Sequence, residues 1–250
     1  MRNILILGGT SEASALARAL AEGGERATLS YAGRVERPKP QPIPTRTGGF
    51  GGVEGLAAYL RDNAVTHLVD ATHPFAAQMS RNAVAAAQDT GVPLIALTRP
   101  PWRAQAGDDW RTAPDIPAAV AALSGPPRRV LLALGRMHLA EFAPQPQHHY
   151  VLRLVDAPEA PPPLPDHTVI VDRGPFTAQG DITLMQDHRI ELVVAKNAGG
   201  TGAEAKLIAA RRLGLPVVMI DRPALPPRQE AVSVEEVLGW LDHPATPRGV

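Results

Sequence analysis

The chain has 250 residues, of which 44% are hydrophobic and 20% are charged, and its formal net charge is zero. This length suits one large or two compact domains, and the neutral balance provides no overall field toward nucleic acid or an anionic membrane. No apolar run approaches the roughly 18 residues of a membrane span, and the first residues read as a strand rather than a signal peptide. Cysteine is absent, which excludes disulfides, thiolate catalysis and thiolate-bound metals. We therefore expect a cytoplasmic protein without a metal, a nucleic-acid partner or a membrane partner.

The chain opens with a strand pattern at residues 4–7, then Gly8-Gly9-Thr10-Ser11-Glu12, then a helical pattern at residues 11–22. A glycine turn at a helix N-terminus gathers bare N–H groups and the positive end of the helix dipole, which suits a phosphate. The spacing departs from G-x-G-x-x-G. A turn that only closes a strand–helix unit therefore stays as the alternative.

Strand patterns follow at residues 27–30, 67–70 and 94–97, and helical patterns at 52–63 and 76–90. This alternation predicts a parallel sheet with helices on both faces. Right-handed crossovers bring the carboxyl ends of its strands to one edge, where such sheets bind ligands. The proline-rich runs 38–44 and 158–165 are expected to be structured loops.

The same pattern restarts in the second half of the chain. Strands are expected at 129–134, 150–154, 168–171, 192–195 and 216–220, and helices at 115–122, 135–142 (after a turn), 179–186, 203–213 and 234–241. The predicted class is α/β, with two Rossmann-like domains that each hold a mainly parallel sheet flanked by helices. We expect a cofactor domain at residues 1–108, a substrate domain at 109–243 and a loose tail at 244–250.

The end of the second strand bears on the choice of cofactor. It reads Ser30-Tyr31-Ala32-Gly33-Arg34, without an acid before Glu36. An acid here holds the ribose hydroxyl of NAD, whereas an arginine accommodates the 2′-phosphate of NADP. Ser30 and Arg34 therefore favour NADP, the alternative being that Arg34 is a solvated loop charge.

The third strand leads into Asp70-Ala71-Thr72-His73-Pro74-Phe75-Ala76. Thr72 is expected to cap the next helix, with Pro74 in its first turn. His73 is either a donor facing the ligand or a buried capping residue. We expect Thr72, His73 and Pro74 to lie at the cofactor edge.

Two segments of the second half carry conspicuous cations and glycines. They are Asp172-Arg173-Gly174-Pro175-Phe176 and Lys196-Asn197-Ala198-Gly199-Gly200-Thr201-Gly202, the latter ahead of a helix that contains Lys206. A glycine turn with a cation at its mouth is suited to a carboxylate. The alternative is a flexible connection with an incidental lysine.

Together, these motifs resemble the precorrin-6A reductase family of cobalamin biosynthesis. The resemblance runs from residue 1 to about 240 and rests on five spaced motifs: residues 7–12, residues 70–76, Arg99-Pro100 with Trp102, residues 173–176, and Lys196-Asn197-x-Gly199-Gly200. It implies two Rossmann-like domains and an NADPH-dependent reduction of one double bond in a polycarboxylate macrocycle, giving precorrin-6B. The family's glycine turn also departs from G-x-G-x-x-G. After Lys-Asn the family usually has a small residue. In this chain that residue is Ala198, which has no hydroxyl, so a role for a side-chain hydroxyl at this position is in doubt.

A substrate with many carboxylates needs several separate cations. The expected substrate residues are Arg46, Arg99, Arg136, Arg173, Gly174, Lys196, Asn197, Gly199, Lys206 and Arg222. The expected cofactor residues are Gly8, Gly9, Thr10, Ser11, Glu12, Ser30, Arg34, Thr72, His73 and Pro74. The proton donor is unassigned: His73, bound water and the acids of the substrate are all candidates.

Two other functions fit the same residues. One is an NADP-dependent reductase of a different polyacid, and the other is a non-catalytic module that senses a nucleotide. The sequence leaves open the oligomeric state and whether the substrate carries cobalt. Hand-over of the product to the next enzyme of the pathway is a further expectation.

Overall fold

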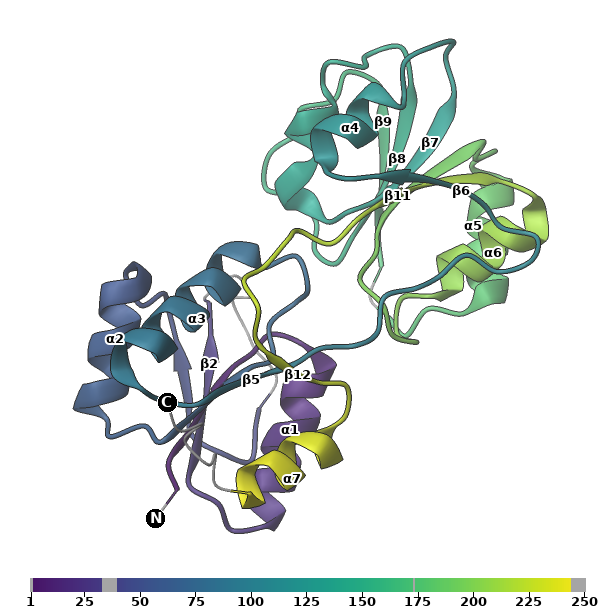
Figure 1. The fold of residues 1–250 in the computed structure, drawn as a ribbon. Helices are drawn as coiled ribbons and strands as arrows, with labels where there is room; N and C mark the ends of the chain where they lie inside the picture. The colour runs from purple at the N-terminus through teal and green to yellow at the C-terminus, as the bar shows by residue number, and fades with distance from the viewer. Residues whose placement is uncertain (1, 33–39, 173, 244–250) are drawn as a thin grey trace. The chain divides into compact units, whose positions relative to one another are not determined.

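The structure is a computed structural model and describes residues 2–32, 40–172 and 174–243. The chain divides into two compact units (Figure 1). Unit 1 comprises Met1–Arg99 together with Ala224–Val250, and unit 2 comprises Pro100–Pro223. Unit 1 is therefore built from two separate stretches of the chain.

Within the described residues, unit 1 holds a six-stranded parallel sheet in the order β12-β5-β4-β1-β2-β3. Its strands are β1 (Ile4–Leu7), β2 (Ala27–Tyr31), β3 (Thr45–Thr47), β4 (His67–Asp70), β5 (Leu94–Leu97) and β12 (Gln229–Ala231). Its helices are α1 (Ser11–Glu22), α2 (Gly52–Asp62), α3 (Ala77–Thr90) and α7 (Val234–Asp242).

The helices of unit 1 cover both faces of its sheet because successive strand residues point to opposite sides. Helices α1 and α7 lie on one side of the sheet and α2 and α3 on the other (Figure 1). Ile4 and Ile6 of β1 belong to the cluster with α1 and α7, whereas Leu5 and Leu7 belong to the cluster with α2 and α3. Every residue of β1 is buried. A central strand that is apolar on both faces is what a doubly covered parallel sheet requires.

Within the described residues, unit 2 holds a second six-stranded parallel sheet, in the order β6-β11-β10-β7-β8-β9. Its strands are β6 (Asp109–Ala113), β7 (Arg129–Ala133), β8 (His149–Leu154), β9 (His167–Val171), β10 (Leu192–Lys196) and β11 (Pro216–Ile220). Its helices are α4 (Ile116–Ala121), α5 (Ala178–Asp187), α6 (Ala205–Leu213) and the 3-10 helices η1 (Arg136–His138) and η2 (Ala140–Phe142). Met185 of α5 and Leu207 of α6 pack with Val193 against one face of the sheet.

The predicted class, α/β with two parallel sheets flanked by helices, is confirmed. Three short strands, β3, β6 and β12, were not predicted, and the segment 135–142 forms two 3-10 helices rather than a longer helix. The predicted second domain, 109–243, differs from unit 2 at both ends. The chain leaves unit 1 at Pro100 and rejoins it at Ala224, because β12 pairs with β5 and α7 packs into the core of unit 1. Residues 244–250 lie outside the described part of the chain.

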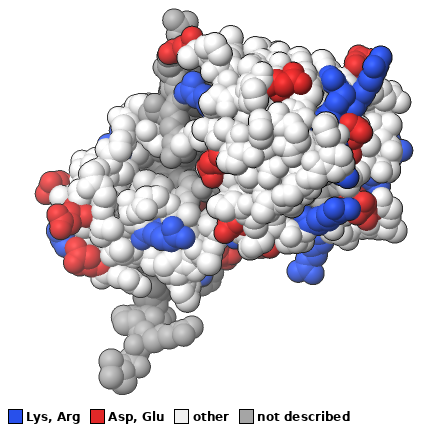
Figure 2. All heavy atoms as spheres, turned by 90° about the horizontal axis from the view of Figure 1, so that it is seen from above, with Lys and Arg blue, Asp and Glu red and all other residues white. Residues whose placement is uncertain are grey.

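On the face drawn in Figure 2, basic and acidic side chains are scattered among uncharged ones. This agrees with the zero net charge of the chain. Recognition of an anion therefore depends on local geometry rather than on an overall field.

Candidate functional site

The carboxyl edge of the unit 1 sheet begins with the glycine turn between β1 and α1. The Gly8 N–H donates to the carbonyl oxygen of Ser30 at 2.9 Å, which anchors the turn to the end of β2. A Cβ at Gly8 would lie 2.5 Å from the Cδ1 atom of Leu29, so a larger residue there would require the Leu29 side chain to shift. Gly9 has φ +119°, and a Cβ there would meet nothing within 4 Å. The turn is thus packed on its inner side and open at Gly9.

Thr10 caps α1 and ties it to the neighbouring strand. Its hydroxyl oxygen accepts from the Ala13 N–H at 3.1 Å and donates to the Ala71 carbonyl at 2.8 Å. An α-helix leaves its first N–H groups without intrahelical partners, and they lie at the positive end of the helix dipole. The first turn of α1 therefore offers amide donors at the carboxyl edge of the sheet, where a phosphate would fit.

Arg99 lies at this same edge, although the sequence predicts it as a ligand of the substrate. Its Nε lies 3.5 Å from Oε1 of Glu12, and the Ser11 hydroxyl donates to the other carboxylate oxygen at 3.0 Å. Glu12 is in the first turn of α1, where its charge would oppose a bound phosphate. Arg99 offsets that charge.

Ser30 and Arg46 meet at the end of β2. They are register partners on β2 and β3, and Nη1 of Arg46 donates to the Ser30 hydroxyl oxygen at 2.7 Å. Ser30 is only 4% exposed. The structure thus brings a residue predicted for the cofactor together with one predicted for the substrate. Arg34, the predicted partner of the 2′-phosphate, lies outside the described residues.

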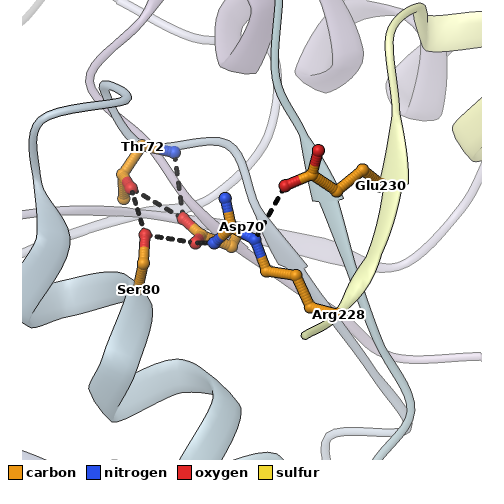
Figure 3. Close-up of polar contacts among 5 residues, drawn as sticks. All are labelled: Asp70, Thr72, Ser80, Arg228 and Glu230. Carbon is orange, nitrogen blue, oxygen red and sulfur yellow. Dashed lines mark hydrogen bonds and ion pairs between the residues drawn. The ribbon is translucent and has the colours of Figure 1, made fainter. Parts of the chain in front are cut away.

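Asp70, at the end of β4, is the centre of a buried polar network (Figure 3). Its Oδ1 accepts from the Thr72 N–H at 3.2 Å and from the Thr72 hydroxyl at 2.7 Å. Its Oδ2 accepts from the Ser80 hydroxyl and from Nη1 of Arg228, both at 2.6 Å. Arg228 also pairs with Glu230 of β12 at 3.2 Å. The network therefore joins β4, α3 and the returning segment of the chain.

This geometry corrects the predicted capping of α3. The helix begins at Ala77 after an Ala76 N-cap without a side-chain bond, so Thr72 does not cap it and Pro74 is not in its first turn. The Thr72 hydroxyl is held by Asp70 instead, because that carboxylate is closer than the helix. Pro74 is buried, whereas His73 is exposed, which excludes the buried capping role for His73. Nδ1 of His73 accepts from the Phe75 N–H at 3.2 Å.

In unit 2, the predicted substrate residues Asn197, Gly199 and Arg222 hold the turn after β10. The Asn197 side chain accepts from the Trp102 N–H at 2.7 Å and donates to the Trp102 carbonyl at 3.1 Å. Arg222 donates to the carbonyls of Asn197 at 2.9 Å and Ala198 at 3.0 Å. A Cβ at Gly199 would lie 2.1 Å from the Pro100 carbonyl oxygen. These groups fix the turn against the segment that enters unit 2.

Lys206 is also part of this packing. Its ammonium donates to the Ala203 carbonyl at 2.5 Å and lies 5.0 Å from the centre of the Trp102 ring. The residue is 6% exposed. The Trp102 indole N–H in turn donates to the Gly200 carbonyl at 2.9 Å. Lys206 thus stabilises the glycine turn through a hydrogen bond to Ala203 and a cation–π contact with Trp102.

The other predicted cations of unit 2 lie at the ends of strands. Lys196 is the last residue of β10, and Arg136 is exposed just after β7. Gly174 is exposed, and Arg173 lies outside the described residues. The sequence did not single out Arg153, whose guanidinium stacks 3.9 Å from the centre of the Phe176 ring and pairs with the buried Asp181. The signal available in the sequence was an arginine within the otherwise apolar run of β8.

A pocket of about 390 Å³ lies within unit 2 beside the Gly200 turn. Its lining includes Trp102, Arg103, Trp110, Thr201, Glu204 and Arg211. Arg211 is paired with Asp108, whereas Arg103 is exposed and has no ion pair with the described residues. The pocket therefore combines indole surfaces with one guanidinium that is available to an anion.

Neither a metal centre nor a membrane span is found in the part of the chain that the structure describes. Its His, Asp and Glu side chains form no group of three or more that would hold a metal ion. No helix there has the length and hydrophobicity needed to cross a membrane.

Two doubly covered parallel sheets and a helix-capped glycine turn at the carboxyl edge define a Rossmann-like α/β protein. The family model described as "Precorrin-6x reductase CbiJ/CobK" matches residues 3–242, and the chain belongs to this family. The precorrin-6A reductase of Rhodobacter capsulatus is 62% identical over 251 residues, which cover 100% of both chains. That of Sinorhizobium sp. is 47% identical over 241 residues, which cover 96% of this chain and 92% of the relative.

A solved structure titled "CobK precorrin-6A reductase" matches with a TM-score of 0.93 and 62% identity over 100% of both chains. The family resemblance found in the motifs is therefore confirmed. The chain is an oxidoreductase of cobalamin biosynthesis, and a reductase of this kind implies a nicotinamide cofactor.

Proposed function

We propose that the protein reduces one carbon–carbon double bond of precorrin-6A to give precorrin-6B, with NADPH as the hydride donor, in the cytoplasm. The observation that carries this proposal is the full-length similarity to enzymes named precorrin-6A reductase. The nucleotide-type edge of unit 1 supports it independently of the names.

In this proposal the nucleotide binds at the carboxyl edge of unit 1. Gly8, Gly9, Thr10, Ser11 and Glu12 form the turn that would hold the pyrophosphate. The fit is supported by Gly9, where open space and a positive φ leave room for a ligand against the backbone. It is also supported by Thr10, which fixes the first turn of α1 while the amides there remain directed to the edge.

The loop after β4 lies beside this turn, because the Thr10 hydroxyl donates to Ala71. Thr72, His73 and Pro74 are therefore proposed as the second wall of the cofactor site. Asp70 holds Thr72 in place through two hydrogen bonds. A loop fixed in this way positions a reactive ring with little loss of freedom on binding.

We place the macrocycle at the carboxyl edge of unit 2. Lys196 is the last residue of β10, and Arg136 follows β7. These two strands are parallel neighbours in the sheet, so both residues lie at its carboxyl edge. Arg103 adds a guanidinium at the neighbouring pocket. Gly174, with Arg173 before it, follows β9 and completes the proposed set. Asn197, Gly199, Lys206 and Arg222 support the turn that presents Lys196.

Bound NADPH supplies a hydride, and the neighbouring carbon of the substrate gains a proton. The protein residues bind and orient the two molecules, since charge-assisted hydrogen bonds fix carboxylates in register. The proton donor is one of three acids that can reach this carbon: His73, which is exposed at the edge of unit 1, a bound water, or a carboxylic acid of the substrate.

The test is the loss of NADPH absorbance at 340 nm with precorrin-6A, with its cobalt-containing form, and without a macrocycle. We expect oxidation only when a macrocycle is present. Oxidation with an unrelated polyacid alone would favour the smaller-substrate reductase. Binding of nucleotide without turnover of any substrate would favour the sensing module.

Lys196→Ala separates the substrate site from the cofactor site. We expect a raised KM for the macrocycle and unchanged NADPH affinity, because Lys196 lies at the carboxyl edge of unit 2 and the cofactor is proposed to bind at unit 1. Lys206→Met is the comparison: it removes the buried lysine of α6 that supports this turn, so it should lower the stability of the protein as well as raise the KM. A Lys196→Ala enzyme with normal KM but lower stability would assign Lys196 to the fold.

A further inference from the structure

The guanidinium of Arg46, a residue of β3, is held at the end of β2, which is the strand next to β1 and its glycine turn. Ser30 and Arg46 are register partners, and the Ser30 carbonyl accepts the Gly8 N–H at 2.9 Å. In the sheet order β1-β2-β3, Arg46 lies on β3 and its guanidinium reaches across to Ser30 of β2, the strand next to the phosphate turn, all within unit 1. Arg46 is remote in sequence from the turn, and Ser30 links the two in the sheet.

The orientation of the Arg46 guanidinium is set from two sides. Nη1 donates to the Ser30 hydroxyl oxygen at 2.7 Å and the Gly48 carbonyl at 3.0 Å, and Nη2 donates to the Gly49 carbonyl at 3.2 Å. Its Cζ lies 3.9 Å from the centre of the Phe50 ring and 5.1 Å from that of Tyr59. A side chain held by three hydrogen bonds and a stacking contact is already ordered before a ligand arrives.

Two donors of Arg46 remain for a ligand. A guanidinium carries five N–H groups, and the three hydrogen bonds above leave the Nε–H and one Nη2–H. These sit on adjacent nitrogens, an arrangement that suits two oxygens of one phosphate. Among the described residues, no carboxylate pairs with Arg46, in contrast to Arg99, which faces Glu12. The positive charge at the end of β2 is thus available to an anion.

We infer that Arg46 is the residue that recognises the 2′-phosphate of NADPH, and that Ser30 positions its guanidinium. In a Rossmann-like sheet the end of the second strand faces the adenosine ribose, where an arginine donates hydrogen bonds to a 2′-phosphate and an acid accepts one from a 2′-hydroxyl. Arg46 does this from the neighbouring strand. This inference rests on the proposed use of NADPH, and it moves Arg46 from the predicted substrate set to the cofactor site.

The test compares ligands that differ only in this phosphate. The affinities of NADP⁺, NAD⁺, 2′,5′-ADP and 5′-AMP are measured by calorimetry for the wild type and for Arg46→Met, which keeps the apolar stem. We expect Arg46→Met to weaken NADP⁺ and 2′,5′-ADP by about 10- to 100-fold, the loss of a charge-assisted pair. NAD⁺ and 5′-AMP should be unaffected. Arg61→Met, from an exposed ion pair on α2, is the matched control and should change none of the four.

Further variants separate the alternatives. Arg46→Lys retains a charge without the planar fork, so its affinity for NADP⁺ should lie between those of the wild type and Arg46→Met. It replaces Arg46→Met in the test if that variant does not fold. Ser30→Ala should reduce the NADP⁺ preference less than Arg46→Met, because it loosens the guanidinium without removing it. An equal loss for NADP⁺ and NAD⁺ would overturn the inference. So would a raised KM for the macrocycle with intact cofactor binding, which returns Arg46 to the substrate.

Failure of the proposed function has a different signature. A wild-type protein that binds NAD⁺ as tightly as NADP⁺ contradicts the use of NADPH and, with it, the role of Arg46. A wild type that prefers NADP⁺ while Arg46→Met keeps the same preference overturns the role of Arg46 alone.

Discussion

Gly9 is the residue on which the proposed phosphate turn depends most directly. Its φ of +119° lies in the region that favours glycine, and a side chain there would project into open space. No atom of the described residues comes within 4 Å of a Cβ built there, so a ligand is the reason we give for keeping this space free.

We predict that Gly9→Val reduces the affinity for NADPH by more than about tenfold, because the new methyl groups occupy the ligand's place and the backbone is strained. Calorimetry gives the affinity and thermal unfolding gives the stability. Gly125→Val is the control: its φ of +134° is similar, and its site in unit 2 is equally open. Equal cofactor affinity in the two variants would remove Gly9 from the phosphate site.

Arg228 and Asp70 form a buried ion pair, with side chains 7% and 1% exposed. Removing one partner leaves the other charge uncompensated in the interior. We predict that Arg228→Met lowers the free energy of unfolding by about 3–5 kcal/mol, measured by urea denaturation. Arg61→Met is the comparison, since the Arg61–Asp89 pair is 55% and 57% exposed and should change stability by less than about 1 kcal/mol.

The double variant Asp70→Asn with Arg228→Met should recover part of that stability. A double variant as unstable as the sum of the single ones would show that the two residues act independently. Arg228 could not be found from the sequence, because it is 158 positions from Asp70 and immediately precedes β12, a strand that no local pattern places in the first sheet. The position of Asp70 at the carboxyl edge of the sheet could be predicted, because it is the last residue of an apolar strand.

At the scale of secondary-structure elements, interior strands were predictable, whereas three of the four edge strands in the described sheets were not. The fourth, β9, was predicted because its sequence contains the apolar run Val-Ile-Val. The interior strands are apolar on both faces, as at β1 and β10, and stand out as short hydrophobic runs. In contrast, β3 reads Thr-Arg-Thr, β6 reads Asp-Trp-Arg-Thr-Ala and β12 reads Gln-Glu-Ala. Strands at the edge of a sheet carry polar residues that resemble loops, so their identity depends on the neighbouring strand.

Helix α7 packs against β4 through a contact of His67, a group that titrates. The His67 ring packs edge-on against Trp240 at 5.4 Å, and burial together with the nearby Arg2 lowers the pKa of His67 below its usual 6.5. The folded state therefore favours neutral imidazole. Above pH 6.5 this contribution to stability is complete, and it is lost as the pH falls from 6.5 through the lower pKa of the folded protein.

We predict that the free energy of unfolding decreases between pH 7.5 and 5.5 more steeply in the wild type than in His67→Gln. Urea denaturation at the two pH values measures the difference, and other titrating groups cancel in the comparison. A steeper decrease in the variant would mean that the protonated ring is the one favoured by the fold.

At the scale of the whole molecule, the division into units could be only partly predicted. The alternation of strands and helices indicated two sheets, and the predicted boundary between residues 108 and 109 lies after the first crossing, which is at Pro100. The second crossing was missed because α7 has the same amphipathic pattern whichever sheet it covers. Only the pairing of β12 with β5 and the burial of Val237 and Leu241 assign it to unit 1.

This division predicts which fragments fold. Residues 100–223 should show a cooperative thermal transition by circular dichroism, whereas residues 1–99 should not, because they lack Val237 and Leu241 from their core. A rearranged chain with residues 224–243 placed before residues 2–99 through a short Gly/Ser linker should restore the transition. The linker need not be long, since Arg2 donates to the Leu241 carbonyl at 2.8 Å. Cooperative melting of 1–99 alone would contradict this assignment.

The split of unit 1 also has a consequence for synthesis on the ribosome. Domains generally fold as units during translation, starting from the N-terminus. Here the order is reversed, because all residues of Pro100–Pro223 emerge before Ala231, Val237 and Leu241 reach the core of unit 1. Until then, the face of the unit 1 sheet that α7 covers in the folded protein stays partly exposed to solvent. The nascent chain thus has a window in which chaperones are expected to bind its N-terminal portion while its middle portion is already native.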